Sequence, residues 1–161
     1  MKYIEYKKAS IRHLDTCEHI CSHFDQIKDE KEKQNVRADT YYLTGYVFEC
    51  ILSYTIFNLI GYHKDKDVFA LNNDNGCRLI FNRHFRTHNI TWKIDYISRH
   101  GGTGVSNVPI LNGNAKCELL KKWNVKFRYT LETPPTFEEI ETFVQLAKST
   151  LVNIRTHITK D

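Results

Sequence analysis

The sequence predicts an all-α fold, an up-and-down bundle of four to five helices in one domain spanning residues 1–161. Apolar residues recur at steps of three and four over long stretches, whereas few stretches show the alternation of a β-strand. Glycine and proline, with 7 and 3 residues, are too scarce for a turn-rich β fold. The length of 161 residues suits one domain with its own core.

The first helix is expected within residues 10–33, because the apolar side chains of this segment form one stripe at helical spacing. The charged run from Asp25 to Lys33 either ends this helix or extends it into solvent. The stripe consists of Ile11, Leu14, Cys17, Ile20, Cys21, Phe24 and Ile27.

Residues 35–59 are expected to form the central helix, with Asn35 as N-cap and Gly61 just past the end. Residues 41–62 are the most apolar of the chain, so nearly every face of this helix should be buried. Glu49 interrupts the run, and a carboxylate at that depth is costly in lipid. We therefore expect a core helix rather than a membrane span. Gly45 would let another helix approach closely.

The second half of the chain is more interrupted. Residues 61–77 are expected as a loop, 78–99 as a helix in one piece or in two pieces broken near 88–91, and 101–114 as the most flexible connection. A fourth helix is expected over 115–129. Thr136 and Glu139 then have the spacing of a capping box that starts a last helix over 137–157.

The net charge is only +4, but the charges are unevenly distributed. Basic residues gather in 78–102, where Asp95 is the only acid and aromatic side chains interleave with the cations. That combination suits a phosphate backbone with unstacked bases. A solvated helix face is the alternative interpretation. The residues predicted to bind nucleic acid are Arg78, Arg86, Lys93 and Arg99.

The five cysteines are an odd number and imply no disulfide framework, so a cytoplasmic location is expected. The first residues also lack the apolar region of a secretory signal. Cys17, His19, Cys21 and His23 have a spacing that invites a zinc site. On a helix, however, the two cysteines face one side and the two histidines another, so the four cannot enclose a metal ion. We therefore expect no metal and no cofactor.

Residues 37–53 resemble the central helix of HEPN domains (higher eukaryotes and prokaryotes nucleotide-binding). That family often shows a Leu-x-Gly-x-x-x-Glu-Cys-x-Leu-Lys pattern here, and this chain has Ser53 in place of the Lys. The matching positions are Leu43, Gly45, Glu49, Cys50 and Leu52. Further pieces that fit in the same order are residues 12–15 (Arg-His-Leu-Asp), 87–90 (Thr-His-Asn-Ile), and Trp123 with Arg128 and Tyr129.

The resemblance implies a helical bundle that usually dimerises. Many members of the family are metal-independent ribonucleases of toxin–antitoxin, CRISPR-associated and phage-defence systems. Other members lack the catalytic motif and act as binding or scaffold modules, sometimes beside a nucleotidyltransferase. For this chain the resemblance implies a cytoplasmic homodimer that engages RNA or a nucleotide, with an antitoxin or a nucleotidyltransferase as candidate partner protein.

The ribonuclease motif of the family is an Arg followed by a polar residue, with a His four to six residues after the Arg. Two segments come near it, Arg12 with His19, and Arg83 with His84 and His88. We take Arg83, His84 and His88 as candidate catalytic residues. His88 would move the proton of the RNA 2′-hydroxyl or of the leaving oxygen, Arg83 would neutralise the phosphorane, and His84 would orient the phosphate. Alternatively, His88 braces a helix start and Arg83 makes a surface ion pair.

Glu49 is expected to be buried among aromatic and aliphatic neighbours. A structural role is favoured over a catalytic one, with Arg128, Tyr129 or a neighbouring helix as its partner. The tyrosines of the same segment are expected to pack in the core and to contribute to a dimer contact. They are Tyr41, Tyr42, Tyr46 and Tyr54.

Overall fold

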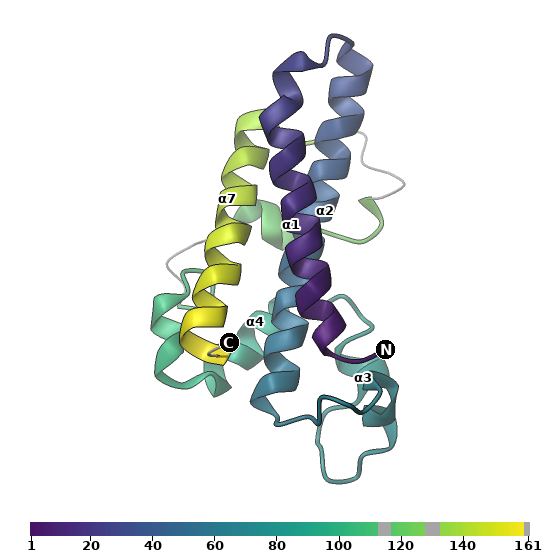
Figure 1. Ribbon diagram of the computed structural model, residues 1–161, viewed down its shortest axis with the longest axis vertical. Coiled ribbons are helices and arrows are strands. Elements are labelled where there is room, and N and C mark those ends of the chain that lie inside the picture. Colours follow the sequence, from purple (N-terminus) through teal and green to yellow (C-terminus); the bar gives the residue numbers. More distant parts are fainter. Residues whose placement is uncertain (113–116, 128–132, 160–161) are drawn as a thin grey trace.

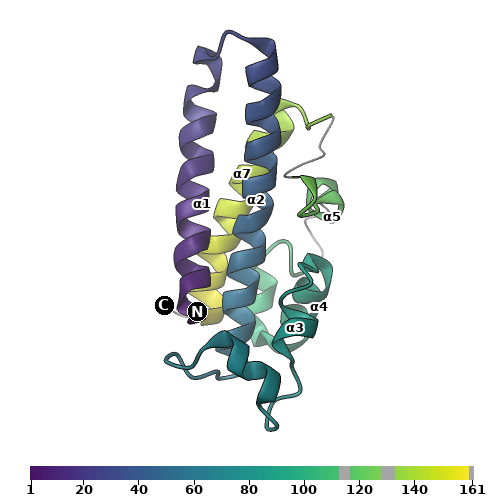
Figure 2. The ribbon, with the colours of Figure 1, turned by 90° about the vertical axis from the view of Figure 1, so that its right-hand side faces the viewer.

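Three long helices, α1 (Ile4–His23), α2 (Glu30–Leu59) and α7 (Phe137–Ile154), lie side by side along the long axis of the molecule (Figures 1 and 2). The computed structural model describes residues 1–112, 117–127 and 133–159. Within these ranges the chain contains helices, turns and a single isolated β-bridge, and no strand. The predicted all-α class is therefore confirmed. None of the helices in the described ranges is long and apolar enough to cross a membrane.

The boundary between α1 and α2 differs from the prediction. Helix α1 begins at Ile4 and ends at His23, and a short 3₁₀ turn, η1 (Phe24–Gln26), follows it. Helix α2 begins five residues before the predicted N-cap Asn35, because Asp29 accepts a hydrogen bond from the backbone N–H of Glu32 at 2.8 Å. The charged run at 30–33 therefore belongs to the first turn of α2.

Helix α2 is the central element of the core, as predicted. Almost every residue from Thr40 to Phe57 is buried, on all faces of the helix. The helix ends at Leu59, and Gly61 adopts a positive φ of 63°, which suits a glycine just past a helix end. At Gly45 the close neighbour is not another helix but the indole of Trp123, which occupies the space of the missing side chain. Trp123 Nε1 donates to the backbone oxygen of Tyr42 at 3.1 Å.

The segment after α2 covers the end of the bundle where the N-terminus lies (Figure 1). It contains η2 (Val68–Asn73), α3 (Phe81–His84), α4 (Ile90–His100) and η3 (Gly102–Asn107). The predicted break near 88–91 is confirmed. Helix α4 starts after it because Asn89 accepts a hydrogen bond from the backbone N–H of Trp92 at 2.9 Å. The expected loops at 61–77 and 101–114 each include a short 3₁₀ segment.

The helix predicted over 115–129 is shorter in the described part of the chain. Helix α5 covers only Glu118–Lys122, and Trp123 is extended, with φ −61° and ψ 136°. Residues 115–116 and 128–129 lie outside the described ranges. The capping box is confirmed: Glu139 N–H donates to the Thr136 hydroxyl at 3.3 Å, and Thr136 N–H donates to the Glu139 carboxylate at 2.7 Å. After α7 the chain continues in a π-helical turn, η4 (Arg155–Thr159).

Candidate functional site

A buried carboxylate connects α2 to the start of α4. The Nδ1 atom of His88 lies 2.7 Å and 2.9 Å from the two carboxylate oxygens of Glu49. The ammonium of Lys93, one turn into α4, donates to the same carboxylate at 3.3 Å. Glu49 lies on the side of α2 that α4 covers, so Lys93 reaches it from α4 and His88 from the turn just before α4. The expectation of a buried Glu49 satisfied by a neighbouring helix is confirmed, whereas Arg128 and Tyr129 lie outside the described ranges.

His88 has an uncommon backbone conformation. Its φ is +55°, in the left-handed region that few residues other than glycine adopt, although His, Asn and Asp tolerate it better than most. The side chain is 37% exposed, so one edge of the ring faces outward while Nδ1 faces Glu49. Because Nδ1–H donates to the carboxylate, Nε2 carries the lone pair in the neutral ring. Within the described residues Nε2 has no hydrogen-bond partner.

Glu49 and its two partners, His88 and Lys93, influence one another electrostatically. Burial alone would raise the pKa of Glu49, but the hydrogen bonds and positive charges of His88 and Lys93 outweigh it, and the pKa lies below its ordinary value. Burial lowers the pKa of Lys93, and the adjacent Glu49 opposes that shift. We conclude that Glu49 is an anion at neutral pH and holds the imidazole of His88 in a fixed orientation.

Next to His88 lies a cavity of about 310 Å³ with aromatic walls. Its residues come from α1, α2, η2, α3 and the turn after α3. Five aromatic rings form most of the wall, and His88, Arg86, Glu49 and the thiol of Cys50 complete it. Burial raises the pKa of Cys50 to about 12, so this thiol stays protonated at neutral pH. The five rings are those of Tyr6, Tyr46, Phe69, Phe81 and Phe85.

The structure places the other predicted catalytic residues outside this cavity. Arg83 is exposed on α3, and Arg86, one turn later, is the arginine that lines the cavity with His88. The backbone N–H of Ile80 donates to His84 Nδ1 at 2.9 Å, and the His84 ring lies against Trp92, with 5.0 Å between ring centroids. His84 therefore contributes to the local packing of α3 and α4.

The predicted nucleic-acid-binding residues divide into two groups. Arg78, Arg86 and Arg99 are exposed, and Arg99 donates to Asp95 on the same helix at 3.1 Å. Lys93 is different, because its side chain is 0% exposed and bonded to Glu49. The prediction that Lys93 contacts nucleic acid is therefore wrong for this fold. The ammonium neutralises an internal carboxylate and cannot reach a phosphate from outside.

On α1, the other candidate pair shares one side of the helix. Arg12 and His19 are both exposed and line the same shallow surface depression. Cys17 is buried with its thiol near the Thr44 hydroxyl, at 3.5 Å. His19 and His23 lie on the exposed side, with their rings tilted by 41° and the ring centroids 4.4 Å apart. The cysteines and histidines of this segment thus face different sides, as the helical spacing predicts.

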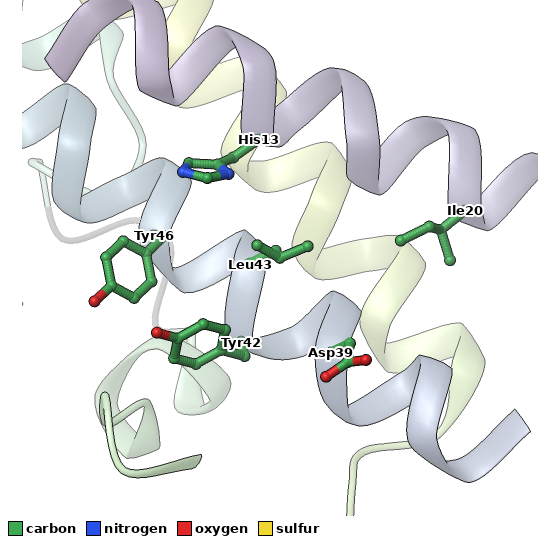
Figure 3. A pocket seen from close by; sticks show the side chains of 6 residues that line it. All are labelled: His13, Ile20, Asp39, Tyr42, Leu43 and Tyr46. Carbon is green, nitrogen blue, oxygen red and sulfur yellow. The ribbon is translucent and has the colours of Figure 1, made fainter. Parts of the chain in front are cut away.

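A second opening lies in the groove between α1 and α2 and has a volume of about 500 Å³. In Figure 3, side chains from both helices lie along this groove, with His13 beside Tyr46 at one end and Ile20 and Asp39 toward the other. Tyr46 lines both this groove and the aromatic cavity, and its ring is 6.1 Å from His13 and 6.2 Å from His88.

Comparison of the chain with protein-family models, curated proteins and solved structures finds no match. Sequence reasoning missed the role of Lys93 and the contributions of Tyr6 and Phe69 to the cavity. A signal for Lys93 was present, because Ile90, Lys93 and Ile97 fall on one stripe of α4. A lysine on an apolar stripe indicates a buried acidic partner. No local signal places Tyr6 or Phe69 beside His88.

Proposed function

We propose that this protein is an RNA-directed HEPN-like protein, a metal-independent endoribonuclease of a defence or toxin–antitoxin system, with His88 as its acid–base group. The observation that supports this function best is the pairing of His88 with the buried Glu49. A carboxylate on Nδ1 fixes the tautomer and the orientation of the ring, so that Nε2 presents its lone pair on the exposed edge. The exposed edge of His88 lies beside Arg86 and an aromatic cavity, which suits a phosphate flanked by a base.

The proposed reaction is transesterification of the RNA backbone. The 2′-hydroxyl attacks the adjacent phosphorus as His88 Nε2 accepts its proton. The bond from phosphorus to the 5′-oxygen breaks, and that oxygen takes a proton from water, leaving a 2′,3′-cyclic phosphate and a free 5′-hydroxyl. His88 then returns the proton that it accepted to solvent. The guanidinium of Arg86 neutralises the charge that builds up on the phosphorane. In this proposal Arg86 replaces Arg83, because Arg86 lines the cavity that His88 lines.

A labelled single-stranded RNA incubated with the protein in EDTA tests the proposal. We expect cleavage products with cyclic phosphate ends. His88→Asn is the sharpest variant, because Asn tolerates a positive φ and its amide can still donate to Glu49, but it does not titrate. Its cleavage rate should fall by about 10²- to 10⁴-fold, the usual contribution of a general acid or base. Intact RNA with folded wild-type protein would falsify the ribonuclease assignment.

The alternative function is a non-catalytic HEPN-like binding or scaffold module for a partner protein or nucleotide. The favouring observation is that Glu49 and Lys93 are buried and join α2 to α4, which a purely structural role also explains. We further propose that the chain forms a homodimer, with the α1–α2 groove as the contact (Figure 3). Sedimentation of wild type and of Leu43→Glu, which places a charge in that groove, tests the dimer.

A further inference from the structure

The aromatic cavity beside His88 has the features of a binding site rather than of a packing defect. Phe69, at its rim, keeps 52% of its surface exposed, although it is a large apolar residue. Its ring meets Phe81 edge to face, with 4.7 Å between centroids, so it is held in place and not loose in solvent. An exposed apolar ring at the mouth of a cavity is the usual mark of a ligand surface.

The charge around the cavity selects an anionic ligand. Arg86 is exposed at the wall, and the carboxylate of Glu49 is already neutralised by His88 and Lys93. Segment 61–77, which carries Phe69, also contains three acids. Asp67 is bonded to the α-amino group of Met1, Asp65 is bonded to Lys2 at 3.3 Å, and Asp74 accepts from the backbone N–H of Gly76 at 3.1 Å. The guanidinium of Arg86 therefore meets little competition from carboxylates of this loop for an incoming anion.

The size of the cavity limits what enters. Drug-sized ligand pockets begin at roughly 300 Å³, so a cavity of about 310 Å³ holds one ring system and not a stacked pair. Flat aromatic walls favour a planar ring, since bases stack on aromatic side chains whatever their sequence. A planar ring next to an anion that a guanidinium can hold is the chemistry of a nucleobase with its phosphate.

We propose that this cavity binds one unstacked nucleobase, with the adjoining phosphate on Arg86 and in reach of His88. The proposal rests on the proposed function and adds the subsite that would position the strand. A duplex cannot present a base in this way without opening, so the site selects single-stranded RNA or a free nucleotide. A bound base would cover the ring of Phe69, so the exposed surface of this ring would be buried on binding.

Isothermal titration calorimetry with a 2′-O-methyl RNA pentanucleotide tests the subsite, because this strand lacks the attacking hydroxyl and is not consumed. Phe69→Ala and Arg86→Ala should each weaken binding by about tenfold, the usual effect of losing one stacked base or one phosphate contact. Phe69→Tyr should bind like wild type, and Phe69→Leu should bind like Phe69→Ala because it keeps bulk but not the aromatic face. Val152→Ala and Lys31→Ala, an exposed apolar residue and an exposed cation remote from the cavity, are the matched controls.

A competition experiment distinguishes an RNA strand from a free nucleotide as the source of the bound base. Adenosine 5′-monophosphate should displace the strand, and adenosine, which lacks the phosphate, should displace it less well. Binding of the mononucleotide without binding of the strand supports the subsite and overturns its use for RNA. Normal binding by Phe69→Ala, or failure of the mononucleotide to compete, overturns the subsite. Cleavage is measured separately, so binding without cleavage removes the proposed enzyme and leaves the subsite standing.

Discussion

Lys93 and Glu49 form an ion pair inside the protein, with Nζ 3.3 Å from Oε1 and side-chain exposures of 0% and 7%. Both charges have lost most of their water, so each depends on the other and on His88 for compensation. The pair lies where α4 packs on α2, and His88 contacts the same carboxylate through Nδ1. The carboxylate of Glu49 therefore serves both the stability of the fold and the proposed chemistry.

Replacing Glu49 by Gln should lower the free energy of unfolding by about 3 kcal/mol, because Lys93 is left as a buried cation without a counter-ion. Urea denaturation measures the change. Glu5→Gln is the control, since its pair with Lys8 is exposed and should contribute less than about 1 kcal/mol. Glu49→Gln combined with Lys93→Met should recover much of the loss, because no buried charge remains. A double variant no more stable than Glu49→Gln would contradict the ion-pair account.

Low pH should lower the free energy of unfolding, partly through protonation of Glu49. Its pKa is lower in the folded than in the unfolded chain, so the unfolded state binds the proton more readily. The stabilisation is thus complete above the ordinary value of 4.5 and is lost as the pH falls through the lowered folded pKa. The difference in unfolding free energy between wild type and Glu49→Gln should shrink as the pH falls below the ordinary value of 4.5. A difference that stays constant over this range would show that Glu49 is not the titrating group.

Substitution of Gly45 by Ala should destabilise the protein, although Ala favours a helix by about 1 kcal/mol over Gly. The added methyl group would collide with the indole of Trp123, which must then leave its place against α2. The hydrogen bond from Trp123 to Tyr42 would break, and the tryptophan emission should shift to the red. The destabilisation that Gly45→Ala causes should be smaller in a Trp123→Phe background, because the smaller ring has room to move.

Loss of the N-cap of α7 should lower the stability of the protein by a small amount. Thr136→Ala removes the hydroxyl that accepts from the backbone N–H of Glu139, and the expected loss is about 1 kcal/mol. Thermal denaturation monitored by circular dichroism measures it. Thr142→Ala is the control, because Thr142 lies within the same helix and its hydroxyl bonds only to a backbone oxygen one turn away. If both variants melt alike, the capping box contributes nothing beyond helix propensity.

The parts of the fold that could be predicted from sequence are those governed by local signals. The apolar period of α2 and the Thr136–Glu139 capping box determine their helices without long-range contacts. Asp29 was missed as N-cap because the turn it starts is charged and has no apolar period. The helix over 115–129 was predicted too long because Trp123 leaves helical geometry to reach Gly45, a contact 78 residues away in sequence.

The candidate site was predictable only in pieces. His88 follows from the Arg…His spacing of the ribonuclease motif, Arg86 from the clustering of basic and aromatic residues, and Glu49 from its place in an apolar helix. Their assembly was not predictable, because Glu49 meets His88 across 39 residues and Lys93 across 44. Charge counting places a lysine at the surface, and the burial of Lys93 follows only from the packing of α4 on α2.

The ring of Tyr46 is a wall shared by two openings, the α1–α2 groove and the aromatic cavity. A ligand that displaced this ring from either side would change the shape of the other space, because the same side chain borders both. Thermodynamic linkage would make any such effect on binding reciprocal. A substitution at Tyr46 therefore alters the groove between the long helices and the cavity beside His88 together.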